Sequence, residues 1–311
     1  MDRPRIRWGV LAGGSLLLGG ALASRVGYRP EDLGPPGPPP PALERDQLRA
    51  VTLNAWRLAN PARVTKLVDG LERSAELLAT GSAARLPEIF AIQEIESREA
   101  ADALRDAVAP THDLLSCECA HEKDGTLRSA VAIGIARDRL TLEGESCVEL
   151  GRIWPDHPRC ALRADVRTSD GEPLTIVAVH MAWHIENDPM ARRLVDALPA
   201  DRPLLVLGDF NTWPGRKAYD TLTRGRLRDA CEGAPPTTPI ARRVDFVLAS
   251  DEIAIDGRLD RRRAFDAMGV ESFLRWPVLR HTFRGPHSRS DADDCPVTDH
   301  LPEGVVLRLA T

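Results

Sequence analysis

Six short apolar runs in this chain each carry, at one end, side chains that can bind a metal ion or a phosphate group. Runs of this length are typical of single buried strands, and strand ends gather at a sheet edge, where many α/β proteins bind ligands. We therefore expect one composite site built from several strand ends. Its candidate members are Asn54, Gln93, Glu94, His180, Asp209, Asn211, Asp245, Asp299 and His300.

The order of apolar runs and helical stretches predicts an α/β (α+β) fold. Apolar residues spaced three and four positions apart predict helices over residues 62–79, 99–108 and 190–198. Between residues 129 and 180 the predicted strands follow one another without a helix, which favours a mixed-sheet sandwich flanked by helices over a uniformly parallel sheet. The predicted strands are Ala50–Asn54, Glu88–Gln93, Ser129–Ile135, Ala161–Val166, Leu174–His180, Leu204–Gly208, Val244–Leu248 and Val305–Leu309.

The composition is that of a soluble globular protein with a sizeable core, because 43% of the 311 residues are hydrophobic and 28% are charged. The formal net charge of −5 argues against a protein that coats nucleic acid non-specifically, since that mode of binding relies on clustered lysine and arginine. The acidic balance is compatible with an enzyme that handles one phosphate group at a time.

The N-terminus carries the features of an export signal. Three arginines precede an uncharged, glycine-rich run from Trp8 to Ala23, which ends in the small-x-small tripeptide Ala21-Leu22-Ala23. The run is shorter than the roughly 20 apolar residues that a spanning helix needs. We expect residues 1–23 to be a signal peptide or an uncleaved membrane anchor, and the mature protein to be exported to the periplasm or the extracellular space.

A proline-rich segment separates this signal-like region from the rest of the chain. Residues 30–41 hold seven prolines, a composition that favours an extended polyproline II spacer. We therefore interpret residues 24–47 as a linker and residues 48–311 as one globular domain. The protein is expected to be a monomer whose only membrane contact is an uncleaved N-terminal anchor.

All six cysteines lie beyond the linker, and an even count in an exported chain favours disulfides. The first pair we expect is Cys147–Cys160, because these two residues flank a predicted turn between strands. Cys117-Glu118-Cys119 is interpreted as structural, since no second pair with zinc-like spacing accompanies it. The rest of the connectivity stays open.

The order of the polar groups resembles the endonuclease/exonuclease/phosphatase superfamily, which has the deoxyribonuclease I-like fold. The resemblance covers residues 50–309. It implies a four-layer sandwich of two packed mixed β-sheets flanked by helices, and a catalytic domain that hydrolyses phosphate esters with Mg²⁺ or another divalent ion. Its most specific elements are Gly-Asp209-Phe-Asn211 and Asp299-His300-Leu-Pro, and it also includes Gln93-Glu94, the strand leading into His180, and Arg243-Val-Asp245-Phe.

Three of the candidate residues offer oxygen ligands that suit Mg²⁺: Asn54, Glu94 and Asp299. Magnesium keeps several of its waters and binds through one or two carboxylates together with a substrate phosphate. Mn²⁺ or Ca²⁺ would fit the same ligands. The set does not offer a cysteine or multi-histidine cage of the kind that zinc prefers.

Hydrolysis by direct attack of water needs a base, and His300 is the candidate, with Asp245 accepting its other ring N–H. Asp209 can orient or deprotonate the same water, so which of Asp209 and His300 is the base stays open. His180 and Asn211 are expected to donate to the non-bridging phosphate oxygens, and His180 could also protonate the leaving oxygen. No covalent nucleophile is required, in agreement with the lack of a GxSxG elbow.

The substrate is expected to be a phosphodiester, with nucleic acid favoured over lipid, because arginines are spread over the loops and the chain lacks a long apolar loop for a membrane surface. Trp183, His184 and Trp213 follow site residues; they are expected either to contact a base or a lipid at the mouth of the site or to cover the core as ordinary loop residues. Cleavage at abasic sites is disfavoured, since relatives with that activity usually carry an acidic residue where this chain has Trp56.

Other functions remain open at this stage. A sphingomyelinase-type phospholipase or a phosphatase acting on a small ester would use the same groups. A non-catalytic binding module on the same fold is the alternative from a different class. Catalysis is favoured over that module because a binding surface would not need Asp245 behind His300.

Overall fold

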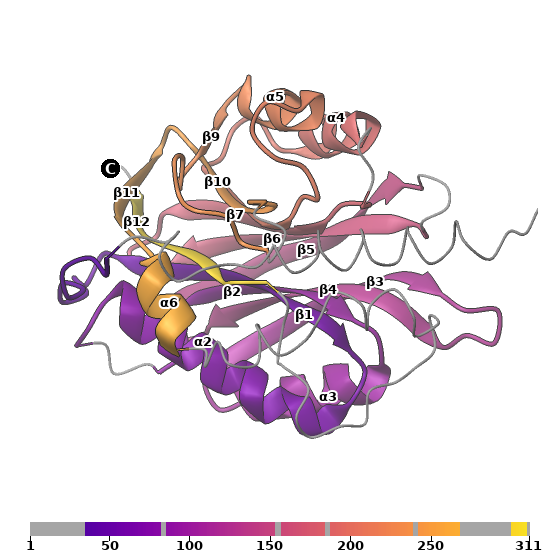
Figure 1. The fold of residues 1–311 in the computed structure, drawn as a ribbon, viewed down its shortest axis with the longest axis horizontal. Coiled ribbons are helices and arrows are strands. Elements are labelled where there is room, and N and C mark those ends of the chain that lie inside the picture. Colours follow the sequence, from indigo (N-terminus) through magenta and orange to yellow (C-terminus); the bar gives the residue numbers. More distant parts are fainter. Residues whose placement is uncertain are drawn as a thin grey trace, which may run out of the picture.

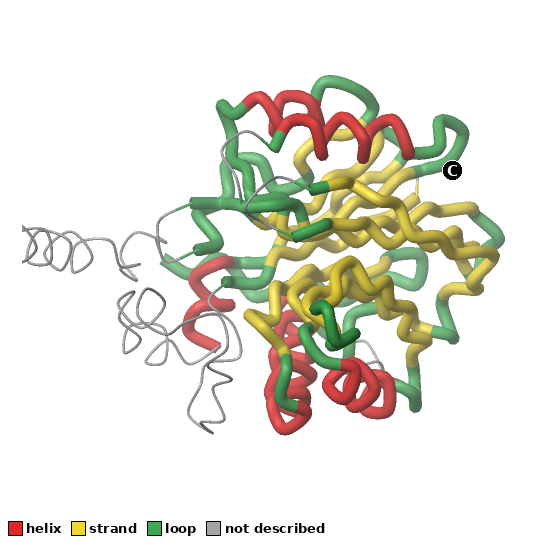
Figure 2. Tube along the Cα trace, turned by 90° about the vertical axis from the view of Figure 1, so that its right-hand side faces the viewer, coloured by secondary structure: helices red, strands yellow, loops and turns green. Residues whose placement is uncertain are grey.

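The computed structural model describes residues 35–81, 85–152, 157–183, 187–238, 242–267 and 300–309. Two six-stranded mixed sheets pack face to face, with helices on both outer faces (Figure 1). Figure 2 shows the same four layers from the side, as two adjacent sheets between two sets of helices. The predicted fold class is therefore confirmed. The predicted export segment, Asp299, His184 and Cys295 lie outside the described residues.

The first sheet has the strand order β11-β12-β1-β2-β4-β3. Helices α2 (Val64–Leu78) and α3 (Arg98–Val108) cover its outer face, and Ser97 caps α3 by accepting a hydrogen bond from the Ala100 N–H. Only β1 and β2 run parallel to each other; the remaining pairs are antiparallel. The strands are β1 (Leu48–Leu58), β2 (Ile89–Ile95), β3 (His112–His121), β4 (Leu127–Ala136), β11 (Ile253–Arg258) and β12 (Glu303–Leu309).

The second sheet has the order β5-β6-β7-β8-β10-β9. Helices α4 (Asp188–Ala197) and α5 (Lys217–Thr223) cover its outer face, while α6 (Arg261–Ala267) follows β11. Here the parallel pair is β7 and β8. The strands are β5 (Leu140–Gly151), β6 (Arg159–Thr168), β7 (Pro173–His180), β8 (Leu204–Asp209), β9 (Leu227–Asp229) and β10 (Asp245–Ser250).

The core lies in three apolar layers, one between the sheets and one under each pair of outer helices. The central strands are buried on both faces, which is why they read as continuous apolar runs. In β1, for example, Ala50 faces the layer between the sheets, whereas Val51 and Leu53 face the layer under α2. Helix α2 meets that layer with Leu67, Leu71 and other residues at helical spacing.

Two disulfides join the sheets to each other at one edge. Cys117 pairs with Cys147 and Cys119 with Cys160, so β3 of the first sheet is linked to β5 and β6 of the second. The predicted pair Cys147–Cys160 is wrong, because the register places Leu162 opposite Cys147 on the neighbouring strand. Side chains alternate along a strand, so Cys117 and Cys119 project from the same face of β3. Within the described residues, Cys231 is a buried free thiol.

Removal of the Cys117–Cys147 disulfide by a double alanine substitution is expected to lower the free energy of unfolding by about 2–4 kcal/mol, since the bond closes a loop in the unfolded chain. The two cysteines are 30 residues apart in sequence. Guanidinium chloride unfolding with and without a reductant measures the change. A reductant that leaves the unfolding midpoint of the wild-type protein unmoved would contradict the expectation.

The latter part of the predicted linker lies against the domain. Leu43 N–H donates to the Thr80 carbonyl at 2.8 Å, and Thr80 N–H donates to the Pro41 carbonyl at 2.9 Å. Further upstream, Gly37 N–H donates to the Asp260 carboxylate. Residues 37–43 are therefore held on the surface of the first sheet's helical side. No helix among the described residues is long and apolar enough to cross a lipid bilayer.

Candidate active site

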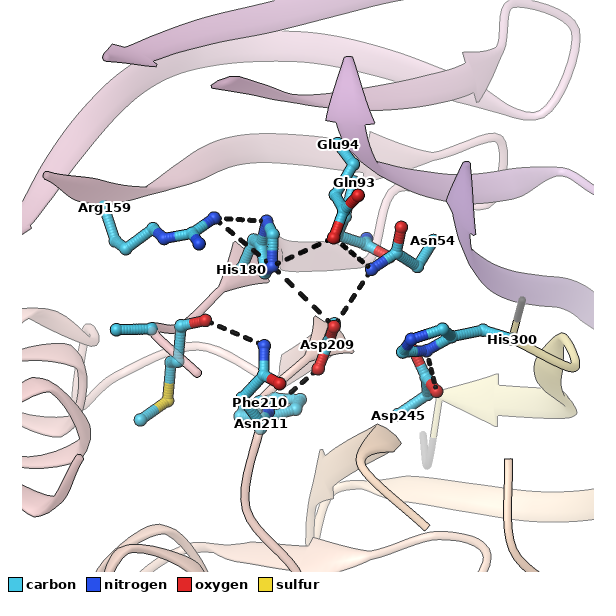
Figure 3. A network of polar contacts seen from close by, with 12 residues as sticks. Asn54, Gln93, Glu94, Arg159, His180, Asp209, Phe210, Asn211, Asp245 and His300 are labelled. Carbon is cyan, nitrogen blue, oxygen red and sulfur yellow. Dashed lines mark hydrogen bonds and ion pairs between the residues drawn. The ribbon is translucent and has the colours of Figure 1, made fainter. Parts of the chain in front are cut away.

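The register of the sheets brings the predicted strand ends to one place. In the parallel pair β7–β8, His180 lies beside Asp209, and in the parallel pair β1–β2, Asn54 lies beside Gln93, just before Glu94. Asp245, the first residue of the antiparallel strand β10, pairs with Asp209. Because β1 packs against β8 and β2 against β7, the two sheets present these ends to each other (Figure 3).

Two carboxylates and an amide form the centre of the site. The Asn54 side-chain NH₂ donates to Glu94 Oε1 at 3.1 Å and to Asp209 Oδ2 at 3.0 Å, while Asn54 Oδ1 accepts the Trp56 N–H at 2.9 Å. In this arrangement the Asn54 side chain holds the two carboxylates together, one from each sheet. Its predicted role as a metal ligand stays a prediction.

A bulge in β1 supports this centre. Trp56 and Arg57 both have positive φ, at 42° and 56°, and the pairing of β1 with β2 shifts between Asn54 and Leu58. The bulge directs the Arg57 N–H to Glu94 Oε2 at 3.0 Å. The carbonyls of residues 55, 56 and 57 all accept hydrogen bonds from the buried Arg63 guanidinium. Sequence reasoning missed Arg63, because an arginine two residues after a proline gives no local signal of burial.

Glu94 and Asn211 also have positive φ, at 60° and 47°. Asparagine tolerates this conformation, whereas glutamate seldom adopts it, and such strained backbone is often found at functional sites. Gly208 is required for a steric reason, because a Cβ at this position would lie 2.0 Å from the Val179 carbonyl oxygen. Only glycine therefore lets β8 approach β7 closely enough to place Asp209 beside His180.

His180 is held by an arginine that sequence reasoning did not identify. Arg159 Nη1 lies 2.8 Å from His180 Nδ1 and 3.3 Å from His180 Nε2, and the shorter contact favours Nδ1 as the acceptor. The neutral ring then carries its proton on Nε2, which lies 3.8 Å from Glu94 Oε1 and 3.7 Å from Asp209 Oδ2. Burial, and then the Arg159 charge, hold the pKa of His180 well below its usual range. His180 thus presents an N–H donor to the centre of the site.

Asp209 is buried at the meeting point of the two sheets. Burial, and then the nearby Asp245 carboxylate, raise the pKa of Asp209 to about 7. Its Oδ1 accepts the Asn211 N–H at 2.9 Å. The Asn211 side chain donates to the Met181 carbonyl at 3.0 Å, which ties the loop after β8 to the end of β7.

The buried side chain of Asn187, also missed from the sequence, reinforces this connection between the loops after β7 and β8. Its Nδ2 atom donates to the carbonyls of Phe210 and Asn211 at 2.9 and 3.1 Å. An asparagine in a loop gives no sign in the sequence of such a role.

Asp245 and His300 form a pair on the other side of Asp209. Asp245 Oδ2 accepts from His300 Nδ1 at 2.8 Å, so the neutral imidazole has its proton acceptor at Nε2 (Figure 3). Thr237 holds both segments in place, since its side-chain oxygen accepts from the Val244 N–H and its carbonyl accepts from the Leu301 N–H. This is the geometry expected of a base and the group that orients it.

The donor atoms form two overlapping groups. Side-chain atoms of Glu94, His180 and Asp209 lie within 4.8 Å of one another, and so do those of Asp209, Asp245 and His300. Two carboxylates that converge with little positive charge between them attract a divalent cation, and oxygen ligands of this kind suit Mg²⁺, Mn²⁺ or Ca²⁺. The residues present therefore fit a divalent metal held by Glu94, with Asp209 beside it.

The predicted aromatic contacts are placed in part. Trp183 is 73% exposed, three residues after His180, so it does not cover the core. Trp213 is half-buried and lies against the guanidinium groups of two arginines. That these two residues contact substrate stays a prediction.

Replacement of Arg159 by methionine is expected to lower kcat by about 10–100-fold, the usual effect of losing a group that orients an active-site side chain. Loss of the nearby positive charge should also raise the pKa of His180 in the metal-free protein, because the protonated ring would no longer be repelled. An NMR titration of the His180 ring measures this directly. Arg163→Met, on the same strand and paired with Asp165, is the control; equal effects of both changes would contradict the assignment.

Comparisons with known proteins agree with this geometry. A model of the Endonuclease/Exonuclease/phosphatase family matches residues 51–264. The human Nocturnin catalytic domain with bound sulfate is 15% identical with a TM-score of 0.61, over 86% of this chain and 95% of that chain. A mannosyl-6-phosphatase of Bacteroides thetaiotaomicron is 16% identical with a TM-score of 0.58, over 84% and 99%.

An endonuclease/exonuclease/phosphatase from Bacteroides vulgatus is 17% identical with a TM-score of 0.59, over 85% of this chain and 99% of that chain. No curated protein matches the sequence. At these identities the structural likeness shows the fold, while the family model covers more than half of the chain and shows the family. The chain belongs to the Endonuclease/Exonuclease/phosphatase family, whose members are phosphoesterases that depend on a divalent metal ion.

Proposed function

We propose that this protein is an exported, Mg²⁺-dependent phosphodiesterase that hydrolyses its substrate by direct attack of water, with nucleic acid as the substrate. The observation that carries the reaction type is the position of Asp209, which belongs both to the group with Glu94 and His180 and to the group with Asp245 and His300. One group suits a metal and a phosphoryl oxygen, and the other suits a water molecule that must lose a proton.

Water is activated on the side of Asp245 and His300. Asp245 keeps the His300 proton on Nδ1, so that Nε2 can accept a proton from water. Asp209 can accept a hydrogen bond from the same water and hold it for attack on phosphorus. A positioned base of this kind is typically worth about 10²–10⁴-fold in rate.

The phosphoryl group is bound on the side of Glu94 and His180. His180 Nε2–H and the Asn211 amide can donate to non-bridging oxygens, where negative charge grows during the reaction. Arg159 keeps His180 in the donor tautomer. A divalent ion held by Glu94, with Asp299 and Asn54 as further candidate ligands, would neutralise charge on the phosphoryl oxygens and the leaving group.

The choice of substrate rests on charge. Exposed or half-buried arginines occur on several segments that adjoin the strand ends, among them Arg57, Arg216 and Arg242. A diester with further phosphates along its chain would meet these charges better than a lipid headgroup on a membrane would. The fold alone does not decide, since structures with this fold include the mannosyl-6-phosphatase named above, whose substrate class is different.

A parallel assay on one preparation tests the proposal. Plasmid DNA, RNA, sphingomyelin vesicles and a soluble phosphomonoester are each incubated with Mg²⁺ and with a chelator, and His180→Ala serves as the inactive control. We expect metal-dependent cleavage of a nucleic acid. Hydrolysis of vesicles with intact plasmid would assign a phospholipase, hydrolysis of the monoester alone a phosphatase, and no hydrolysis of any substrate a binding module.

Export is supported by the signal-like segment at residues 1–23 together with the two disulfides, since disulfides persist in oxidising compartments. Non-reducing mass analysis of protein recovered from the periplasm or medium tests this. Six free thiols in that material, or retention of the protein in the cytoplasm, would overturn the proposal. We also propose that the protein is a monomer, which light scattering would measure.

A further inference from the structure

We propose that Trp213, Arg216 and Arg242 form a second anion-binding subsite beside the reacting centre, which takes a phosphate group other than the one that is hydrolysed. We call these three residues the Arg–Trp–Arg stack. The inference rests on the proposed phosphodiesterase function and extends it to substrates that carry at least two phosphate groups.

The residues of the stack lie in the loops that follow β8 and precede β10, and these two strands carry Asp209 and Asp245. Asp209 ends β8, Asp245 begins β10, and the two residues are paired. Trp213 lies shortly after Asp209 in the chain, and Arg242 lies shortly before Asp245. Since Trp213 is two residues from Asn211, their Cα atoms are within about 7 Å, at roughly 3.3–3.6 Å per residue. The backbone of Trp213 therefore lies beside Asn211, which is proposed to bind the reacting phosphate.

The two guanidinium groups are held by the tryptophan ring. The Cζ atoms of Arg216 and Arg242 lie 4.5 and 4.1 Å from the centroid of the Trp213 ring. A cation over an aromatic face is attracted by the ring's quadrupole, and stacking leaves the N–H edge of a guanidinium open to other partners. Trp213 and Arg216 are half-buried and Arg242 is exposed, so the stack extends from the domain into solvent.

No described carboxylate neutralises the charges of the stack. Within the described ranges, neither Arg216 nor Arg242 forms an ion pair with a carboxylate, whereas the neighbouring Lys217 pairs with Asp188. Two like charges kept on one ring, with no counterion in the part of the chain that the structure describes, form a site for an anion. Guanidinium groups match the geometry of phosphate, to which they can each donate two hydrogen bonds.

The ligand is thus a second phosphate of the substrate. Its source is either the neighbouring phosphate of a nucleic acid strand or the other phosphate of a small bisphosphate. On this basis Trp213 acts by positioning the two arginines, instead of stacking a base or touching a lipid.

Binding is measured by fluorescence anisotropy in the full chain, in a His300→Ala background with Mg²⁺ so that the ligand is not consumed. The ligands are a labelled single-stranded decanucleotide, with adenosine 3′,5′-bisphosphate and AMP as competitors. Arg216→Gln with Arg242→Gln is compared with Arg105→Gln, an arginine on the outer helix α3. Trp213→Leu tests the positioning role, and thermal unfolding checks that each variant is folded.

We expect the double glutamine variant to bind the decanucleotide and the bisphosphate about tenfold more weakly and AMP less than twofold more weakly, because only the first two carry a second phosphate. The slope of log affinity against log salt for the decanucleotide should become shallower by about 1–2, or roughly one unit for each phosphate that the variant no longer neutralises. Trp213→Leu should show part of the same loss, and Arg105→Gln none.

Weakening confined to the bisphosphate would support the subsite and assign it to small bisphosphates. The inference would be overturned if the double glutamine variant lost the same affinity for all three ligands or lost none. It would also be overturned if the wild-type protein bound AMP as tightly as the bisphosphate. Turnover is measured separately with the unmodified chain. A lack of turnover would remove the proposed function, while the difference between bisphosphate and AMP would still decide the subsite.

Discussion

Replacement of Asp209 by asparagine is expected to lower kcat for a phosphodiester by about 10²–10⁴-fold and to leave the domain folded. Asp209 is buried, and burial together with the Asp245 carboxylate raises its pKa to about 7. A charged carboxylate in such a place raises the free energy of the folded state, because it has lost most of its hydration. The substitution removes that penalty at the cost of one of the two hydrogen bonds that the carboxylate accepts, and it also removes the charge that is proposed to hold the attacking water.

Steady-state kinetics with a soluble diester and thermal unfolding measure the two effects on the same samples. Asp251→Asn is the matched control, since Asp251 is an exposed carboxylate whose side chain is 85% accessible. The control should change neither kcat nor Tm. An Asp209→Asn protein that keeps its activity and loses stability would show that Asp209 is a structural residue.

Replacement of Glu94 by glutamine is expected to abolish metal-dependent turnover at limiting Mg²⁺ without unfolding the domain. Glu94 comes from the first sheet, and its two carboxylate oxygens accept from the Asn54 side-chain NH₂ and from the Arg57 N–H; the single oxygen of a glutamine keeps one of these two hydrogen bonds. What the substitution removes is the negative charge that a divalent cation needs. A chelator should have the same effect on the wild-type protein.

Metal binding has a readout that does not depend on turnover. At a Mg²⁺ concentration of 100 times its Kd, the ion should stabilise the wild-type protein by about 2.7 kcal/mol, and Glu94→Gln should lose most of this. Glu99→Gln, at the first turn of helix α3, serves as the control and should retain it. Stabilisation by Mg²⁺ that is the same in wild type and Glu94→Gln would place the metal elsewhere.

Much of the candidate site could be predicted because its residues stand at the ends of buried strands. Glu94, His180 and Asp209 each follow an apolar run, and the parallel pairs β1–β2 and β7–β8 bring such ends to one edge. The strands that carry them are buried on both faces, so their sequences are strongly apolar and easy to recognise. The chemical roles of these residues stay predictions that the variants above test.

The edges of the sheets could not be predicted in the same way. β3 and β5 are edge strands, and neither was expected from the sequence. β5 has an exposed face and reads as a mixture of polar and apolar residues, which resembles a loop. The disulfide pairing depends on these two strands, so an error in the strands led to the error at Cys147–Cys160.

The supporting arginines were missed for a different reason. Arg63 and Arg159 are both buried in the structure, although arginine is among the residue types least often buried. Their partners are backbone carbonyls in one case and the His180 ring in the other. Neither kind of partner leaves a pattern in the sequence, so only the folded structure identifies these residues.

The position of β12 in the first sheet determines when, during synthesis, the proposed active site can be completed. β12 is inserted between β1 and β11, although it follows every other strand in sequence, and His300 lies three residues before its first residue, Glu303. Synthesis proceeds from the N-terminus, so β1 is made long before the strand that completes its sheet. Until then Asp245 has no imidazole to orient. In the proposed mechanism a nascent chain would therefore lack its base, and hydrolysis would begin only after the last strand of the domain has been synthesised.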